Sequence, residues 1–223
     1  MKNIFASFKN KTLLDTALTH RSALNEKISP SIENNERLEF LGDAVLELAT
    51  TSYLFIEYPK QQEGILTAFR SSLVKTETLA QISTEIGLGE ALYMSKGEES
   101  TGGRKNVGIL ADSFEALLGA VYLDRGFKAV ETVLQKHLFP KFAEIKKNKL
   151  YRDAKSSLQE VVQAQGFTAP DYKVIAAVGP DHNKKFTVQV LVEGKSMGEG
   201  KGKNKQTAQQ AAAREALEKY QAK

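Results

Sequence analysis

The stretch "NNERLEFLGDAVLEL", residues 34–48, decides how the first half of the chain folds. Its apolar residues recur every three or four positions, which predicts an amphipathic helix that packs through Leu38, Leu41, Val45 and Leu48. At about 100° per residue, one arc of roughly 80° holds four acids: Glu36, Glu39, Asp43 and Glu47. Such like charges repel by roughly 0.2–0.5 kcal/mol per pair. The stripe is either a solvated face or a set of ligands.

A second segment helps to decide between these interpretations. The stretch "VGILADSFEALLGAVYLD", residues 107–124, is apolar almost all round and predicts a buried helix. Before its last residue it holds only two acids, Asp112 and Glu115, one turn apart. A buried carboxylate costs several kcal/mol unless it is paired, neutralised or bound to a metal.

Two explanations that need no bound metal ion compete for this second acid pair. A distant cation such as Arg37 or Arg70 pairs with it, or it lies exposed on a narrow strip. Because acid pairs occur on two separate helices, a cation shared between them is the favoured explanation.

The available ligands indicate which cation that is. The chain has no cysteine and three histidines far apart, so zinc and copper sites are disfavoured. Carboxylate oxygens suit Mg²⁺, with Mn²⁺ as a substitute. An ion held in this way typically orients a phosphate oxygen and an attacking water. Glu63 follows Pro59 in an expected loop, where it adds a ligand, directly or through water, or is simply solvated.

The composition sets the protein class. The 223 residues are 41% hydrophobic and 26% charged, which is typical of globular proteins. The absence of cysteine excludes disulfides and thiolate catalysis. No apolar run reaches the roughly 18 residues of a spanning helix, and the first eleven residues lack the apolar core of a signal peptide. We expect a cytoplasmic protein with no membrane partner.

The charge is unevenly distributed along the chain. Residues 1–149 contain 19 Lys and Arg against 19 Asp and Glu, whereas residues 150–223 contain 12 against 8. A net charge of +4 is unremarkable by itself, but its concentration in the last third indicates a module that binds a polyanion.

The pattern of apolar residues changes at the same place. Helical periodicity dominates residues 1–148, a charged linker covers 149–152, and residues 153–223 predict a helix, three short strands and a closing helix. We therefore predict a multidomain chain: an all-α domain followed by a small α+β (α-β-β-β-α) domain with its helices on one face of an antiparallel sheet.

These motifs resemble those of a known family. "NNERLEFLGDAVL" and "ILADSFEALLGAVYLD" are similar to the acidic helices of bacterial ribonuclease III, and "ALTHRS" (17–22) and "GEESTGGRKN" (97–106) also fit its pattern. The last 70 or so residues resemble the double-stranded-RNA-binding domain joined to that nuclease. The resemblance covers essentially the whole chain in the right order, and this combination of motifs is specific.

The resemblance implies a double-stranded-RNA-specific endoribonuclease. Its helical domain is expected to form a homodimer with one Mg²⁺-dependent site per protomer and no small-molecule organic cofactor. Each site is then expected to hydrolyse one strand, leaving a 5′-phosphate, a 3′-hydroxyl and a short 3′ overhang. The expected roles are processing of ribosomal and messenger RNA precursors and RNA decay.

The family motif also assigns roles to individual acids. The expected metal-binding acids are Glu39, Asp43, Asp112 and Glu115, of which Asp43 and Glu115 are the expected catalytic residues. Glu36 and Glu63 match accessory acids, and Glu47 has no counterpart. We expect His20 to pack and hydrogen-bond, and Gly102, Gly103 and Arg104 to form a loop in which Arg104 is a possible phosphate contact.

Three places in the last third match RNA contacts of the family. Duplex RNA is recognised through its 2′-hydroxyls and phosphates. The expected contacts are Gln159 and Glu160 on the first helix, Pro180 and His182 on the loop after the first strand, and Lys201, Lys203 and Lys205 before and at the start of the last helix. The chain departs from the family at Gln206, which stands in place of a second cation, and at Gln209, which replaces a common acid.

Two other functions compete with this one. A catalytically dead RNA-binding scaffold is disfavoured because every expected acid is present. A metal-dependent phosphohydrolase of small nucleotides is disfavoured because a small substrate needs no RNA-binding module.

Overall fold

The computed structural model describes residues 4–147, 154–180 and 184–221. The chain forms two compact units, Met1–Tyr151 and Arg152–Lys223. The predicted linker, residues 149–152, lies outside the described residues. None of the helices described is both long and apolar enough to cross a membrane.

The first unit is helical, as the sequence predicts. Its described residues pair in the manner of strands only at a single bridge, between Thr19 and Tyr93. Its α-helices are α1 (Lys11–Ala17), α2 (Arg21–Glu26), α3 (Glu36–Glu57), α4 (Glu63–Leu73), α5 (Thr76–Glu85), α6 (Leu88–Ala91), α7 (Lys96–Ser100), α8 (Val107–Arg125), α9 (Phe127–His137) and α10 (Lys141–Lys147). Two short 3₁₀ helices are η1 (Ile4–Ser7) and η2 (Gly103–Lys105).

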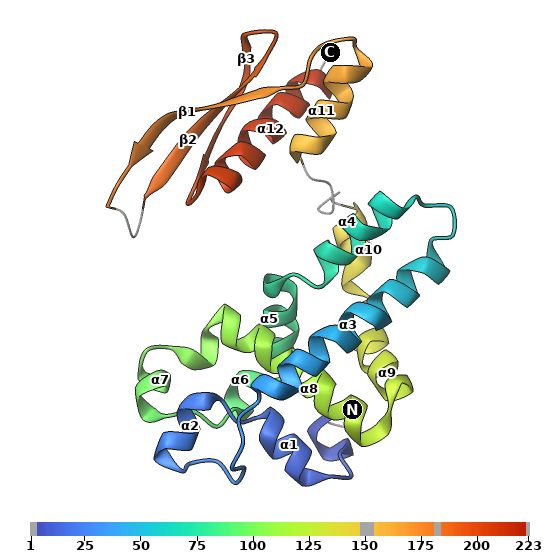
Figure 1. Ribbon diagram of the computed structural model, residues 1–223, viewed down its shortest axis with the longest axis vertical. Coiled ribbons are helices and arrows are strands. Elements are labelled where there is room, and N and C mark those ends of the chain that lie inside the picture. The colour runs from blue at the N-terminus through green and yellow to red at the C-terminus, as the bar shows by residue number, and fades with distance from the viewer. Residues whose placement is uncertain (1–3, 148–153, 181–183, 222–223) are drawn as a thin grey trace. The chain divides into compact units, whose positions relative to one another are not determined.

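Helices α3 and α8 form the centre of this unit and pack directly on each other (Figure 1). Most side chains of α8 between Leu110 and Val121 are buried, which confirms the prediction of a core helix. Because the shorter helices surround this pair, the relative position of α3 and α8 determines where their acids lie.

The packing face of α3 differs from the predicted one. Leu38 and Val45 are buried as expected, but Leu48 is 58% exposed and Leu46 is fully buried. Gly42 explains the difference. Because it has no side chain, the backbone of α8 packs directly against the side of α3 that carries Gly42 and, one turn later, Leu46. The acids therefore lie at the edge of the α3–α8 contact instead of opposite it.

The second unit has the predicted α-β-β-β-α order: α11 (Ala154–Ala164), β1 (Asp171–Val178), β2 (Lys185–Val192), β3 (Lys195–Gly202) and α12 (Lys205–Gln221). The sheet is antiparallel with β2 in the middle; Tyr172 lies opposite Val190, and Val190 opposite Gly198. A small core joins Leu158 of α11 and Val190 of β2 to Ala212 of α12. Both helices cover one face of the sheet, as Figure 1 shows.

Alternating glycines allow α12 to approach the sheet closely. A Cβ atom on Gly200 would lie 2.1 Å from the backbone nitrogen of Ala212, and one on Gly202 would lie 2.5 Å from that of Ala208. Any side chain at these positions of β3 would push the helix off the sheet. The "GEGKG" segment is thus a packing surface as well as a strand.

Candidate functional site

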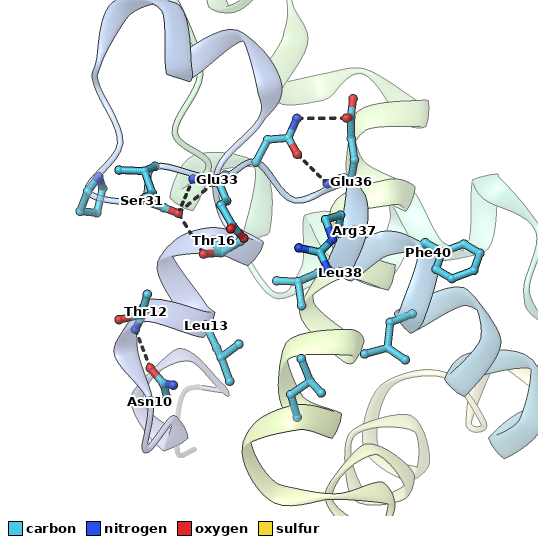
Figure 2. Close-up of a pocket in the computed structure, with 15 residues that line it drawn as sticks. Asn10, Thr12, Leu13, Thr16, Ser31, Glu33, Glu36, Arg37, Leu38 and Phe40 are labelled. Atoms are coloured by element: carbon cyan, nitrogen blue, oxygen red, sulfur yellow. Dashed lines mark hydrogen bonds between the residues drawn. The ribbon is translucent and has the colours of Figure 1, made fainter.

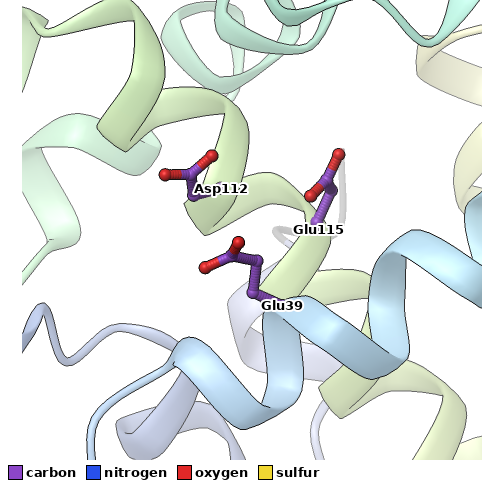
Figure 3. A group of neighbouring side chains, drawn as sticks. All are labelled: Glu39, Asp112 and Glu115. Carbon is purple, nitrogen blue, oxygen red and sulfur yellow. The ribbon is translucent and has the colours of Figure 1, made fainter.

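Three carboxylates from two distant segments meet in the first unit. Glu39 of α3 and Asp112 and Glu115 of α8 each offer an oxygen, and these oxygens all lie within 4.8 Å of one another. Figure 3 shows the three side chains gathered between the two helices. Oxygens that share an octahedral Mg²⁺ lie about 2.9–4.2 Å apart, so small side-chain movements suffice to bring these acids onto one ion.

Two glycines at the helix crossing make this meeting possible. A Cβ atom on Gly42 would lie 1.8 Å from the backbone oxygen of Glu115, and one on Gly119 would lie 2.2 Å from that of Leu38. The two backbones therefore touch at the level of the acids. Sequence reasoning missed both residues, although glycine inside a helix costs roughly 1 kcal/mol relative to alanine and so signals a packing constraint.

The acids repel one another in the absence of a cation. Burial, followed by the charges of Asp43, Asp112 and Glu39, raises the pKa of Glu115 to about 7. Burial raises the pKa of Glu39 as well, with further contributions from Asp112, Glu36 and Asp43. The pKa of Asp112 is also raised by burial, against an opposing effect of His20. A divalent cation would offset this repulsion.

No basic side chain performs that task in residues 4–147, where neither Lys nor Arg forms an ion pair with the three acids. Arg70 instead pairs with Glu47 at 2.9 Å and donates to Thr51. Glu47 is thereby accounted for as a surface charge. The donor set of three oxygens without a counter-cation fits a divalent metal site.

Asp43 stands apart from this group. It is exposed, lies one turn beyond Glu39 on α3, and is not among the three acids that converge. Its charge is nevertheless the second-largest cause of the raised pKa of Glu115. Its role as a metal ligand stays a prediction.

The structure separates the two accessory acids. Glu36 begins α3 and lines a cavity of about 280 Å³ together with Glu39 and Asp112. Glu63 was expected on a loop, but it is the first residue of α4. Its carboxylate accepts a hydrogen bond from Thr67. It lines a different pocket, of about 430 Å³, so within one chain only Glu36 joins the acidic cavity.

His20 and Arg104 have structural contacts. The Nδ1 atom of His20 accepts a hydrogen bond from the backbone nitrogen of Ser22 at the start of α2, as expected of a packing residue. Arg104 lies in η2; its Nε bonds to Glu99 at 2.7 Å and its Nη1 donates to three backbone oxygens, those of Gly89, Glu90 and Leu92. The guanidinium group is therefore already hydrogen-bonded within the first unit. This argues against the phosphate contact considered for Arg104.

Asn106 places the start of α8. Its side-chain oxygen accepts hydrogen bonds from the backbone nitrogens of Gly108 and Ile109, which fixes where the helix that carries Asp112 begins. The signal was available in the sequence, because an asparagine directly precedes the apolar run.

The predicted RNA contacts of the second unit that the structure describes are exposed. Gln159 and Glu160 lie on α11, and Pro180 follows β1. Lys201 lies on β3, Lys203 follows it, and Lys205 begins α12, whose backbone is capped by the side chain of Asn204. His182 lies outside the described residues.

Comparisons with known proteins place this geometry in a family. A Ribonuclease-III-like model matches residues 10–142, and a double-stranded RNA binding motif matches residues 154–220. Ribonuclease 3 of Pelotomaculum thermopropionicum is 47% identical over 213 residues, 96% of this chain and 88% of that protein. The chain belongs to the ribonuclease III family. It is an endoribonuclease specific for double-stranded RNA.

Other members of the ribonuclease III family support the assignment over both units. Ribonuclease 3 of Bacillus licheniformis is 44% identical over 220 residues, 99% of this chain and 88% of that protein. The solved nuclease domain of the Campylobacter jejuni enzyme is 41% identical with a TM-score of 0.56, covering 61% of this chain and 94% of that one.

Proposed function

We propose that this member of the ribonuclease III family cuts duplex RNA at a Mg²⁺ site formed by Glu39, Asp112 and Glu115, with Asp43 as a fourth ligand. One observation carries the proposal: three carboxylates from two helices converge without a counter-cation, and two of them, Glu39 and Glu115, are partly buried. Mn²⁺, which accepts the same oxygen ligands, is the expected substitute. Glu36 is the accessory acid within the same chain, and Glu63 is an accessory acid in a different pocket.

The chemistry divides between the ion and the chain. When bound, the ion supplies positive charge beside the phosphate and makes an attacking water more acidic. Glu115 and Asp43 are the proposed catalytic residues: as ionised carboxylates they would hold the ion and orient the attacking water. The α3–α8 contact holds these side chains in place during the reaction. Hydrolysis would leave a 5′-phosphate and a 3′-hydroxyl.

The second unit holds the substrate. Its exposed lysines and the start of α12 provide charge and backbone donors for phosphates, while α11 presents Gln159 and Glu160 to a minor groove. Pro180 and His182 would contact the next minor groove along. Residues 1–148 and 153–223 are the proposed domain bounds.

We further propose a homodimer formed through the first unit. Phe40 is 81% exposed and lies beside an apolar pocket of about 940 Å³ lined by Leu13, Leu41 and Leu123 (Figure 2). Exposed Phe55 and other apolar side chains continue along α3. The C. jejuni nuclease domain is described as having a region involved in dimer formation. A second copy would cover this apolar surface and join two cutting sites, giving a short 3′ overhang.

The proposed cellular role is processing of ribosomal and messenger RNA precursors and RNA decay. Such a role places the protein in the cytoplasm, where bacterial transcripts are matured.

The test is a cleavage assay on perfectly paired RNA with Mg²⁺, with Mn²⁺ or with a chelator. Wild-type protein is expected to cut only with metal. Glu115→Gln is expected to bind RNA as the wild type does and not to cut it. Glu47→Gln is the matched control, since Glu47 lies on the same α3 stripe but pairs with Arg70, and it is expected to cut normally.

The outcomes separate the competing functions. RNA retention without cutting would indicate a scaffold, and hydrolysis of mononucleotides in preference to duplex would indicate a small-nucleotide phosphohydrolase. Cutting by Glu115→Gln at the wild-type rate would remove that residue from the mechanism.

The dimer has its own test by sedimentation equilibrium. Phe40→Asp is expected to shift the protein toward monomer, whereas Val178→Asp, at another exposed apolar position, in the second unit, is expected to leave it dimeric. A wild-type protein that sediments as a monomer would overturn the dimer.

A further inference from the structure

Lys155 has an unusual position in the second unit. Its Nζ donates to the side-chain oxygen of Gln209 at 2.9 Å and lies 5.0 Å from the centroid of the Tyr172 ring. The residue lies on the first turn of α11, is half-buried, and reaches across to α12. Both contacts fix the ammonium group without neutralising its charge.

Neutral groups, and no carboxylate of the described residues, hold the ammonium group of Lys155 in place. Lys141 pairs with Glu85 and Lys219 with Glu215, each at 2.7 Å, whereas no Asp or Glu of the described residues forms an ion pair with Lys155. Its hydrogen-bond acceptor is a neutral amide. A cation held in a fixed position by neutral groups is prepared to bind an anion from outside the chain.

The place of Lys155 indicates which anion that is. Gln209 follows Lys205 by four residues on α12, so the two side chains share a face about one turn apart. The ammonium group of Lys155 therefore lies within about one helical turn of the basic start of α12, whose second residue, Gln206, carries no charge. Lysines and a helix start at such spacing suit consecutive phosphates of a nucleic acid backbone.

We propose that Lys155 is an additional phosphate contact of the RNA-binding surface, held in place by Gln209 and Tyr172. The proposal rests on the binding of double-stranded RNA by the second unit. The proposed contact requires a neutral acceptor at position 209, because a carboxylate there would pair with Lys155 and compete with the phosphate.

The experiment measures duplex RNA binding by the full chain, by fluorescence anisotropy in EDTA over a series from about 50 to 200 mM salt. Lys155→Gln is expected to bind several-fold more weakly, with a salt slope smaller by about 1, the value expected for one lost phosphate contact. Lys155→Arg is expected to keep the wild-type slope. Lys219→Gln, which removes a paired lysine at the far end of α12, is the matched control and is expected to change neither quantity.

A second variant tests the neutral partner without touching Lys155. Gln209→Glu is expected to lower the salt slope by about 1 as well, because the new carboxylate pairs with the lysine. Since Lys155 and its contact with Tyr172 remain, this variant answers the question even if Lys155→Gln fails to fold in a melting experiment.

The outcomes are distinct. An unchanged slope in folded Lys155→Gln or in Gln209→Glu overturns the contact, as does an equal loss in Lys219→Gln. Failure of the wild type to bind duplex RNA would instead overturn RNA binding by the second unit.

Discussion

Gly42 and Glu115 touch backbone to backbone: a Cβ atom on Gly42 would lie 1.8 Å from the carbonyl oxygen of Glu115. This contact sets the distance between α3 and α8 and hence between Glu39 on one helix and Asp112 on the other. The proposed metal site therefore depends on a residue that has no functional group of its own.

Gly42→Ala is predicted to weaken both the fold and the metal site. The added methyl group meets backbone, which cannot rotate away, so the helices must separate at a cost of about 1–3 kcal/mol. That cost exceeds the gain of up to about 1 kcal/mol that alanine brings to a helix interior. Thermal melting and Mg²⁺ titration measure the two losses.

Gly64→Ala is the control for this substitution. Gly64 also lies in a helix, but a Cβ atom there meets nothing within 4 Å. It is expected to melt at the wild-type temperature or slightly above. If Gly42→Ala behaved in the same way, the close approach of the two helices would not matter for stability.

The raised pKa of Glu115 predicts how metal-free stability depends on pH. An unfolded Glu ionises near pH 4.5, whereas folded Glu115 ionises at about 7. Between these values the folded state holds a proton that the unfolded state has released, so the stability of the first unit falls as pH rises through this window.

Glu115→Gln is accordingly predicted to be more stable than the wild type at pH 8 in EDTA. The Glu115 carboxyl is partly exposed, so solvent screening limits the difference in the free energy of unfolding to the order of 1–2 kcal/mol. At pH 4.5, where the wild-type residue is protonated, the two proteins should melt together. A constant difference across the whole range would exclude ionisation as its cause.

Binding of Mg²⁺ is predicted to release protons from the wild-type protein near pH 6.5. Glu115 must lose its proton before it can ligate the ion, so metal affinity should rise with pH up to about 7 and then level off. Titration calorimetry in two buffers of different ionisation enthalpy measures the protons released. Equal heats in both buffers would show that the site is already ionised before the metal binds.

The sequence determines much of this site because helical spacing is local. The positions of Glu39, Asp112 and Glu115 on their own helices follow from residue numbers, and the need for a shared cation follows from their apolar surroundings. The order of elements in the second unit follows in the same way from the change of period.

The parts that were wrong depend on contacts between elements. Leu48 was expected in the core and is exposed, because the position of the packing face depends on how closely α8 approaches Gly42. Glu63 was expected on a loop and begins a helix. Neither result follows from the period of one segment, since each depends on what the neighbouring element contributes.

Arg104→Gln is predicted to destabilise the first unit by about 1.5–3 kcal/mol while leaving the salt dependence of RNA binding unchanged. The guanidinium bonds to Glu99 and to the backbone oxygens of Gly89 and Leu92, and its removal leaves these acceptors without their donor. Lys105→Gln, at the next and exposed position, should cost less than about 0.5 kcal/mol. A smaller salt slope in Arg104→Gln would restore the phosphate contact that the structure argues against.

Gly200→Ala is predicted to disrupt the second unit while sparing the first. A Cβ atom at this position would lie 2.1 Å from the nitrogen of Ala212 and 2.3 Å from the oxygen of Ala208, both backbone atoms of α12. The helix must therefore move off the sheet, and the basic residues at its start move with it. Duplex RNA binding should fall sharply, whereas the metal affinity of the first unit should not change, because that unit has its own core.

Ser196→Ala, at an exposed position of the same strand, is the control and should bind RNA normally. Wild-type affinity in Gly200→Ala would mean that the packing of α12 against β3 does not position the RNA-binding surface.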